Sequence, residues 1–447
     1  MSIPVVTVGH SSEDLVGGLE RLHGPVSVVR RCGELAELLA ACQSGLARAA
    51  VVAEGSEELT ASLVDRLSAV GVAVLALTDR PEEMARLRGI GVAAELPGVG
   101  AAALAGRITA AVARLGGAGS RPGPGVDLAY AGTADAETMY DDTQYDAGTT
   151  RKPSDGGPQL AGTGQIIAVW GPAGSPGRTL LAANIAGELA AEGKSVLLVD
   201  ADSYGASVAA LLGLLDEAAG LAQACRLADQ GLLDGEALLR IATPVATRSG
   251  TFRVLTGITR AERWTELRAA ALSRVLELAR QAADVTVIDT GFCLESDEEL
   301  SFDTMAPRRN AATLRSLELA DTVFAVGAAD SIGVPRLVRG LAELHAAVPE
   351  ASPRVVLNKV RSAAVGRSPE RQLRDAWERY GPAAALSAFL PADAAVCDAA
   401  LLSGSLLLET APDSGLRKAI AGLVCAPAQR NRRSSVFSST ADRRLKR

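Results

Sequence analysis

Residues 165–202 limit the possible folds of this chain more than any other segment. They begin with a short apolar run, Ile166–Trp170, which predicts a buried strand. A loop with three glycines and two prolines follows, and then apolar residues three and four apart predict a helix. A second apolar run ends at Asp200. Strand, glycine-rich loop, helix and strand form a unit that binds phosphate groups through backbone N–H groups at a helix N-terminus.

The 447-residue chain divides into four segments by composition and periodicity. In residues 1–115, short aliphatic runs alternate with helical patterns, which predicts a parallel sheet covered by helices on both faces. Residues 116–163 are rich in Gly, Pro, Ser, Thr and Asp without any period, which predicts a flexible linker. Residues 164–425 predict a second doubly wound α/β domain with a mostly parallel sheet. Residues 426–447 predict a basic, disordered tail.

Residues 1–115 contain five predicted strands, at Val5–Val8, Val26–Arg30, Ala50–Ala53, Val72–Leu77 and Val92–Glu95. Their order resembles a response-regulator receiver domain, which has a flavodoxin-like fold. The residues that phosphoryl transfer requires are missing, because Glu54 follows the third strand and Leu96-Pro97-Gly98 follows the fifth. We therefore expect a pseudo-receiver that serves docking or dimerisation. Glu54 is interpreted as a loop residue, with mimicry of a phosphorylated aspartate as the alternative.

Composition excludes several classes of protein. Six cysteines are scattered without a CxxC pair, which argues against a disulfide framework and a zinc site. No run reaches ~18 apolar residues, and the N-terminus has no basic segment leading into an apolar one, so a cytoplasmic protein is expected. The net charge is −7, yet Arg430–Arg447 carries +6 and the remainder −13. DNA binding is therefore not expected of the acidic body.

The second domain contains further recognisable elements. The pattern predicts a long helix over Glu262–Ala282 and a strand, Asp284–Asp289, that ends in an aspartate. Other expected elements are strands at Arg253–Leu255, Thr322–Val326 and Arg354–Leu357, and a final helix near Ser414–Val424.

A magnesium-nucleotide site needs backbone amides around the phosphates, a cation, a hydroxyl that binds Mg²⁺ and a carboxylate near the metal. Arg178 is the predicted cation, Thr179 the hydroxyl and Asp289 the metal-site carboxylate. Asp200 and Asp202 follow the strand after the loop helix, so all these groups lie at the carboxyl ends of parallel strands, where ligands bind. The predicted phosphate-binding loop comprises Gly174, Ser175, Pro176, Gly177, Arg178 and Thr179.

Four segments carry a family resemblance: VWGPAGSPGRTLLAANIAGELAAEGKSVLLVDAD, VTVIDT, VVLNKVR and LPADAAVCDAALLSGSLLLETAPDSGLRKAIAGL. They resemble the MinD/ParA class of P-loop ATPases over nearly all of residues 165–425. With a pseudo-receiver in front, the chain is similar to CpaE/TadZ proteins, which position Flp-type pilus machinery, and to actinobacterial MinD-like proteins with PGRT loops. The resemblance implies ATP and Mg²⁺ as cofactors, a homodimer, and pilus-assembly or septum-site proteins as partners.

The resemblance also assigns roles to single residues. Asp200 and Asp202 match the catalytic switch that orients the attacking water, and Asp289 matches the Walker B carboxylate. Asn358 matches the residue that reads the adenine edge, and Pro391 and Asp393 fall in the loop that lies against the adenine. Each of these residues alone has an ordinary structural explanation, as a strand cap or a turn residue.

Three departures weaken the expected activity. Ala173 replaces the family's signature lysine, and Arg178 replaces the loop lysine with a planar, forked and longer cation. Pro176 removes one amide from the loop. We expect nucleotide binding to survive, while ATP hydrolysis is left open, because cations that stabilise a transition state contribute several kcal/mol each.

Three functional hypotheses follow. The first is an ATP-binding positioning protein of the CpaE/TadZ type, and the second is a nucleotide-blind scaffold for dimerisation and docking. The third, a ParA-like chromosome-partitioning ATPase, is disfavoured by the acidic body. For the basic tail, a solvated segment is weighed against weak contact with the inner face of the plasma membrane, at ~1 kcal/mol per basic residue.

Overall fold

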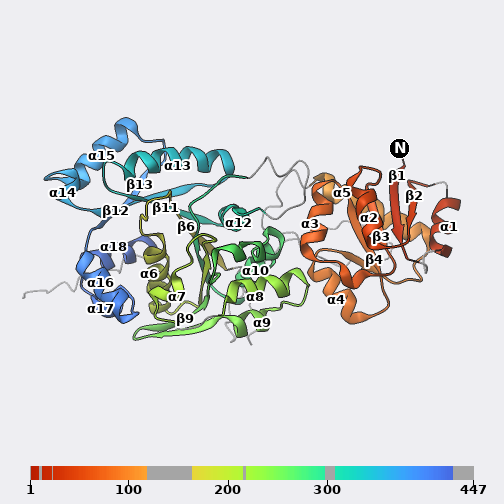
Figure 1. Cartoon of the computed structure of the whole chain (residues 1–447), viewed down its shortest axis with the longest axis horizontal. Helices are drawn as coiled ribbons and strands as arrows, with labels where there is room; N and C mark the ends of the chain where they lie inside the picture. Colours follow the sequence, from red (N-terminus) through yellow and green to blue (C-terminus); the bar gives the residue numbers. More distant parts are fainter. Residues whose placement is uncertain are drawn as a thin grey trace, which may run out of the picture.

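The computed structural model describes residues 2–9, 13–22, 24–117, 164–214, 218–296 and 308–425. These residues form two α/β units (Figure 1). The predicted tail lies outside the described residues, as does the predicted linker apart from its first two residues, which end a helix. Among the described helices, none has the length and apolar character needed to cross a membrane.

The N-terminal unit is a five-stranded parallel sheet in the order β2-β1-β3-β4-β5, which is the flavodoxin-like order. The predicted strands are confirmed to within two residues, and the runs of β3 and β4 are fully buried in the sheet. The strands are β1 (Ile3–Val8), β2 (Val26–Cys32), β3 (Ala49–Val52), β4 (Ala73–Leu77) and β5 (Ala93–Glu95). The helices are α1 (Glu13–Arg21), α2 (Leu35–Gln43), η2 (Ser56–Glu58), α3 (Ala61–Ala69), α4 (Pro81–Gly89) and α5 (Ala101–Gly117).

The C-terminal unit is an eight-stranded sheet in the order β13-β12-β11-β6-β10-β7-β9-β8. Its strand pairs are parallel except for β8 with β9. The chain leaves β6 toward one edge and later returns to its other side, so β6 is the topological switch point at which open sheets bind ligands. The strands are β6 (Gln165–Trp170), β7 (Val196–Ala201), β8 (Thr243–Thr247), β9 (Gly250–Leu255), β10 (Val285–Thr290), β11 (Thr322–Ala328), β12 (Pro353–Val360) and β13 (Leu386–Pro391).

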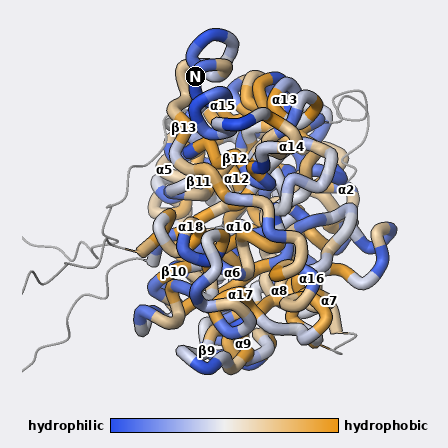
Figure 2. The backbone as a smooth tube through the Cα atoms, turned by 90° about the vertical axis from the view of Figure 1, so that its left-hand side faces the viewer, coloured by the Kyte–Doolittle hydropathy of each residue, from blue (hydrophilic) through white to orange (hydrophobic). Residues whose placement is uncertain are grey.

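Helices cover both faces of this sheet (Figure 1), because successive side chains of each strand point to opposite faces. Ile167 and Val169 join a core with α6, α17 and α18, whereas Ile166 joins a core with α8 and α10. Figure 2 shows the hydrophobic segments in the interior of the chain trace. The helices are α6 (Arg178–Ala191), α7 (Val208–Leu211), α8 (Gly220–Asp229), α9 (Gly235–Ile241), η3 (Ala261–Glu266), α10 (Ala269–Ala282), α12 (Ala311–Leu319), α13 (Gly333–Ala347), α14 (Ser362–Val365), α15 (Pro369–Tyr380), α16 (Ala394–Ser403), α17 (Leu407–Thr410) and α18 (Gly415–Val424).

Buried polar contacts fix the helix that follows the glycine-rich loop. Glu188 of α6 is 2 % exposed and accepts two hydrogen bonds of 2.6 Å from the guanidinium of Arg417 in α18. Asn184 accepts the Leu407 N–H at 2.8 Å. Charge-assisted bidentate pairs are the stronger class of hydrogen bond, so α6 is held rigidly beneath the loop.

The sequence prediction was wrong in one helix and missed the two edge strands, β8 and β13. The segment 262–282 is not one helix but a 3₁₀ helix, η3, followed by α10. The chain turns at Leu267, whose side chain is 2 % exposed and packs in the core, which a continuous helix would not allow. The edge strand β8 was not predicted, because its alternating pattern is short and contains a proline.

The two units contact each other through α3 on one side and α8 and α10 on the other (Figure 1). The Ser62 N–H donates to Asp229 Oδ1 at 2.8 Å. Arg86 donates to the Gln230 carbonyl at 3.0 Å while it pairs with Glu83 at 2.8 Å, and this pairing lowers the pKa of Glu83. Polar and charged groups therefore contribute much of this contact.

Candidate functional site

The glycine-rich loop connects β6 to α6 in a conformation that needs glycine. Gly174 and Gly177 have φ angles of 112° and 98°, values that side chains rarely tolerate. Ser175 adopts a left-handed φ of 52°, which is uncommon for a residue other than glycine and concentrates at functional sites. The loop leads directly into the N-terminus of a 14-residue helix, where unpaired N–H groups attract anions.

Arg178 is bound to its own loop and to an acidic residue. Its Nη1 donates to the Gly171 carbonyl at 3.1 Å, and its Nη2 forms an ion pair with Asp202 at 3.2 Å. The arginine side chain is 12 % exposed and that of Asp202 is 8 % exposed. Arg178 therefore neutralises Asp202 and is not a free cation.

Asp289, at the end of β10, is fully buried with both carboxylate oxygens unpaired. It lies opposite Asp200 in the parallel register of β10 and β7. Burial raises the pKa of Asp289 well above its ordinary value, and the charge of Asp200 raises it further, while the nearby Thr179 hydroxyl and Arg178 charge oppose the shift. A buried carboxylate without partners is costly, so this arrangement is poised for a positively charged ligand.

Asp200 is buried as well, but it has backbone partners. Its Oδ2 accepts the Val208 N–H at 3.0 Å and its Oδ1 accepts the Asp202 N–H at 3.3 Å. Burial raises the pKa of Asp200 to about 6, although the backbone hydrogen bonds counteract part of the effect. The group is thus near its titration midpoint just below neutral pH.

Asp202 organises the segment that follows β7. Its Oδ1 accepts the N–H groups of Tyr204 at 2.9 Å and Gly205 at 3.2 Å. The Tyr204 hydroxyl donates to Asn310 at 2.8 Å, and the Arg309 guanidinium lies 4.1 Å from the centre of the tyrosine ring. Residues 202–205 are therefore held in place by the Asp202 carboxylate, by Asn310 and by Arg309.

The residues at this edge of the sheet fit a magnesium ion held partly by phosphate oxygens. Within the described residues, no three His, Cys, Asp or Glu side chains form a metal centre by themselves. Mg²⁺ usually keeps several waters and binds through one or two carboxylates and substrate phosphates. The unpaired oxygens of Asp289 and the hydroxyl of Thr179, at the first turn of α6, supply suitable ligands.

Asn358 and Lys359 contact the loop from β12. Asn358 is 4 % exposed, and its Nδ2 donates to the Pro176 carbonyl at 2.8 Å. Lys359 has a left-handed φ of 61°, and its Nζ donates to the Ser175 carbonyl at 2.8 Å. The structure therefore brings Asn358 to the loop as a support, while its predicted role in reading adenine stays a prediction.

Replacing Asn358 with Ala is expected to weaken binding of phosphate ligands by about five- to tenfold, the effect of about one hydrogen bond. If Asn358 acts by holding the loop, Mg-ATP and Mg-tripolyphosphate lose affinity equally, because the latter has no base. Isothermal titration of both ligands measures this. A loss confined to Mg-ATP would instead support adenine reading.

Pro391 and Asp393 lie at the end of β13, next to β12. Pro391 is opposite Val360 in the strand register, two residues beyond Asn358. Asp393 caps the N-terminus of α16, where its carboxylate accepts the Val396 N–H at 3.3 Å. The structure thus places both residues at the same edge of the sheet as the loop, and the hydrogen bond of Asp393 is made within its own helix rather than to the loop.

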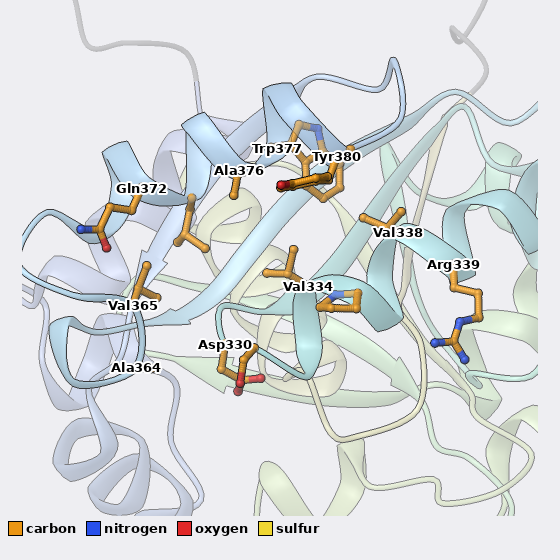
Figure 3. Close-up of a pocket in the computed structure, with 14 residues that line it drawn as sticks. Asp330, Val334, Val338, Arg339, Ala364, Val365, Gln372, Ala376, Trp377 and Tyr380 are labelled. Carbon is orange, nitrogen blue, oxygen red and sulfur yellow. The ribbon is translucent and has the colours of Figure 1, made fainter.

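Two hollows lie beside α13, and one of them adjoins the loop. The smaller, about 420 Å³, is lined by the loop residues Ala173 and Gly174 and by Arg336 and Arg361. The larger, about 690 Å³, is a mainly apolar groove between α13 and α15 (Figure 3). The aspartates at the ends of β7 and β10 do not line the apolar groove, so it is not the candidate phosphate site.

Sequence reasoning missed two cations near the loop. The sequence did indicate that Lys359 lies near the loop, because this residue directly follows Asn358 at a strand end. It gave no such indication for Arg336, because this residue lies in a helix far from the loop in the sequence.

A parallel sheet with a glycine-rich loop at its switch point, a following helix and acidic strand ends defines a P-loop nucleotide-binding domain. The family described as "CobQ/CobB/MinD/ParA nucleotide binding domain" matches residues 167–404, which is more than half of the chain. The chain belongs to this family. The resemblance to the MinD/ParA class is thereby confirmed at the level of the superfamily.

Several solved structures are similar to part of this chain. The cell division ATPase MinD of Pyrococcus furiosus is 21 % identical, with a TM-score of 0.45, and the match covers 58 % of this chain and 97 % of that one. A ParA family ATPase from Chlorobium tepidum is 20 % identical, with a TM-score of 0.46 and coverages of 58 % and 98 %. The septum site-determining protein MinD of Pyrococcus horikoshii, complexed with Mg-ADP, is 19 % identical, with a TM-score of 0.44 and coverages of 58 % and 94 %. No curated protein sequence matched this chain.

Proposed function

We propose that this chain is an ATP-binding positioning protein of the CpaE/TadZ type, which localises pilus or septum machinery. The observation that carries nucleotide binding is the buried, unpaired carboxylate of Asp289 beside Thr179 and a glycine-rich loop. Burying a carboxylate in that state costs free energy. A magnesium-nucleotide complex would compensate it.

The residues of this chain divide the work in the proposed site. The loop N–H groups and the α6 N-terminus bind the phosphates, and Thr179 and Asp289 hold Mg²⁺, which when bound neutralises phosphate charge. Asp200, whose pKa is about 6, is mostly ionised at neutral pH and able to accept a proton from an attacking water. Asp202 orients Arg178 and the segment 202–205.

The alternative is a nucleotide-blind scaffold, and Arg178 is the observation that favours it. Its guanidinium donates a hydrogen bond to the Gly171 carbonyl and forms an ion pair with Asp202. A phosphate that binds Arg178 must therefore compete with this ion pair. Pro176 also removes an amide from the loop. These features leave binding feasible and make rapid hydrolysis the less supported part of the proposal.

The remaining parts of the proposal concern the whole chain. We infer a cytoplasmic homodimer in which the N-terminal unit, residues 1–115, acts as a pseudo-receiver for docking. Residues 116–163 serve as the linker, residues 164–425 as the nucleotide-binding domain and residues 426–447 as a basic tail with weak affinity for the inner membrane surface. The acidic body supports partner proteins rather than DNA.

Equilibrium titration of the full chain with Mg-ATP and Mg-ADP tests the proposed function. Wild type is expected to bind both, and Thr179→Ala to bind at least about tenfold more weakly, because a Mg²⁺ ligand is lost. The exposed Thr265 of η3 provides a control, since Thr265→Ala is expected to match wild type. If wild type binds neither nucleotide at millimolar concentration, the scaffold function replaces the proposed one.

A further inference from the structure

A group of cations lies beside the glycine-rich loop, separate from the acidic cluster. Arg336 of α13 and Arg361, after β12, line the hollow of about 420 Å³ whose other wall includes Ala173 and Gly174. The single acidic residue among the lining residues, Asp330, accepts the N–H groups of Ile332 and Gly333 at 3.0 and 2.7 Å. This hollow is therefore positively charged and opens next to the loop.

Arg336 lies against the loop backbone. A Cβ added to Gly174 would come within 2.7 Å of Arg336 Nη1, so the guanidinium occupies the space that a side chain at 174 would need. In the part of the chain that the structure describes, the Arg336 side chain takes part in no ion pair or hydrogen bond. Its donors are thus available to an anion bound at the start of the loop.

Arg336 lies closest to the place where the third phosphate of a bound nucleotide would be. N–H groups at the α6 end of a P-loop hold the α- and β-phosphates, so a third phosphate extends toward the start of the loop, at Ala173–Gly174. Ala173 contributes no charge there, and Arg178 is already paired with Asp202. The Arg336 guanidinium lies at this end of the loop, 2.7 Å from the position that a Cβ at residue 174 would take.

We propose that Arg336 binds the γ-phosphate of a nucleotide held by the same chain and so makes the site prefer triphosphates over diphosphates. The inference rests on the proposed nucleotide binding and adds the preference for a nucleoside triphosphate over a diphosphate. Arginine suits this task because its fork donates two parallel hydrogen bonds to phosphate oxygens, and a cis arginine stabilises charge at a transferring phosphoryl group.

Titration of wild type, Arg336→Ala and Arg339→Ala with Mg-ATP and Mg-ADP tests the proposal. Arg339 is the matched control, because it is an exposed arginine of the same helix that lines the apolar groove instead (Figure 3). Arg336→Ala is expected to lose about tenfold in Mg-ATP affinity, the effect of one charge-assisted hydrogen bond, with Mg-ADP affinity unchanged within about twofold. Arg339→Ala is expected to match wild type, and Arg336→Lys to recover part of the loss.

Each other result has a defined meaning. Equal losses for both nucleotides, or no loss for either, overturn the role of Arg336 and leave the proposed function standing. A wild type that binds neither nucleotide overturns both. Because Arg336 is exposed, the thermal midpoint of Arg336→Ala is expected to equal that of wild type, which separates a binding defect from misfolding.

Discussion

Replacing Asp289 with Asn is expected to stabilise the ligand-free protein while it abolishes magnesium-dependent nucleotide binding. Both carboxylate oxygens of Asp289 are buried without a hydrogen-bond partner and face Asp200 across the sheet register. An amide keeps the shape, carries no charge, and has N–H groups that can donate to a neighbouring carboxylate. Replacing the buried carboxylate with this amide is expected to raise the free energy of unfolding by about 1–3 kcal/mol at pH 8.

The pH dependence follows from the direction of the pKa shift. The folded pKa of Asp289 lies well above 3.8, so the folded state binds a proton more tightly than the unfolded state does. Wild-type stability therefore falls as pH rises from about 4 through the folded pKa, and the Asp289→Asn substitution removes this loss. The gain in stability from the substitution is expected to be small near pH 4 and to grow toward pH 8, as measured by urea denaturation.

Asp284, just before the start of the same strand, provides a control, because its replacement with Asn is expected to change stability in the opposite direction. Its carboxylate accepts the Ser195 N–H and hydroxyl at 2.8 Å each, and these hydrogen bonds lower its pKa. Asp284→Asn is therefore expected to destabilise the protein at pH 8 and to leave nucleotide affinity unchanged. If Asp289→Asn were also destabilising at pH 8, Asp289 would be a structural residue and not a ligand of Mg²⁺.

Much of the fold was predictable because it depends on local patterns. Aliphatic runs of four to six residues, such as Ile166–Trp170, are buried in parallel sheets whatever their neighbours. Aspartates that end such runs, Asp200 and Asp289, must meet at one edge, because parallel strands share the direction of their carboxyl ends. The acidic part of the candidate site could therefore be predicted from the aspartates at the ends of the predicted strands.

The behaviour of the cations was not predictable in the same way. Arg178 was interpreted as a phosphate cation from its place in the loop, but its ion pair with Asp202 depends on where two different strands end. Arg336 reaches the loop from α13, so only the packing of that helix against β11 places it there. Long side chains span several ångströms, and sequence spacing does not determine which partner they reach.

Replacing Arg178 with Ala is expected to destabilise the ligand-free protein by about 3 kcal/mol at pH 8, because it leaves Asp202 without its buried partner next to two further carboxylates. The loss is expected to shrink at pH 5. Asp200, whose pKa is raised to about 6, is then largely protonated, so the acidic cluster carries less negative charge to compensate. Urea denaturation at both pH values measures the change.

A double-mutant cycle with Asp289→Asn tests the physical cause of this loss. If Arg178 stabilises the fold by neutralising the acidic cluster, removing one carboxylate reduces the need for it. The loss caused by Arg178→Ala is then smaller in the Asp289→Asn background by about 1 kcal/mol or more. Additive effects, or a loss that is equal at pH 5 and pH 8, would mean that Arg178 acts mainly through its hydrogen bond to the Gly171 carbonyl and its packing. Because the same guanidinium must leave Asp202 to meet a phosphate, a strong coupling would also measure the ion pair that nucleotide binding has to displace.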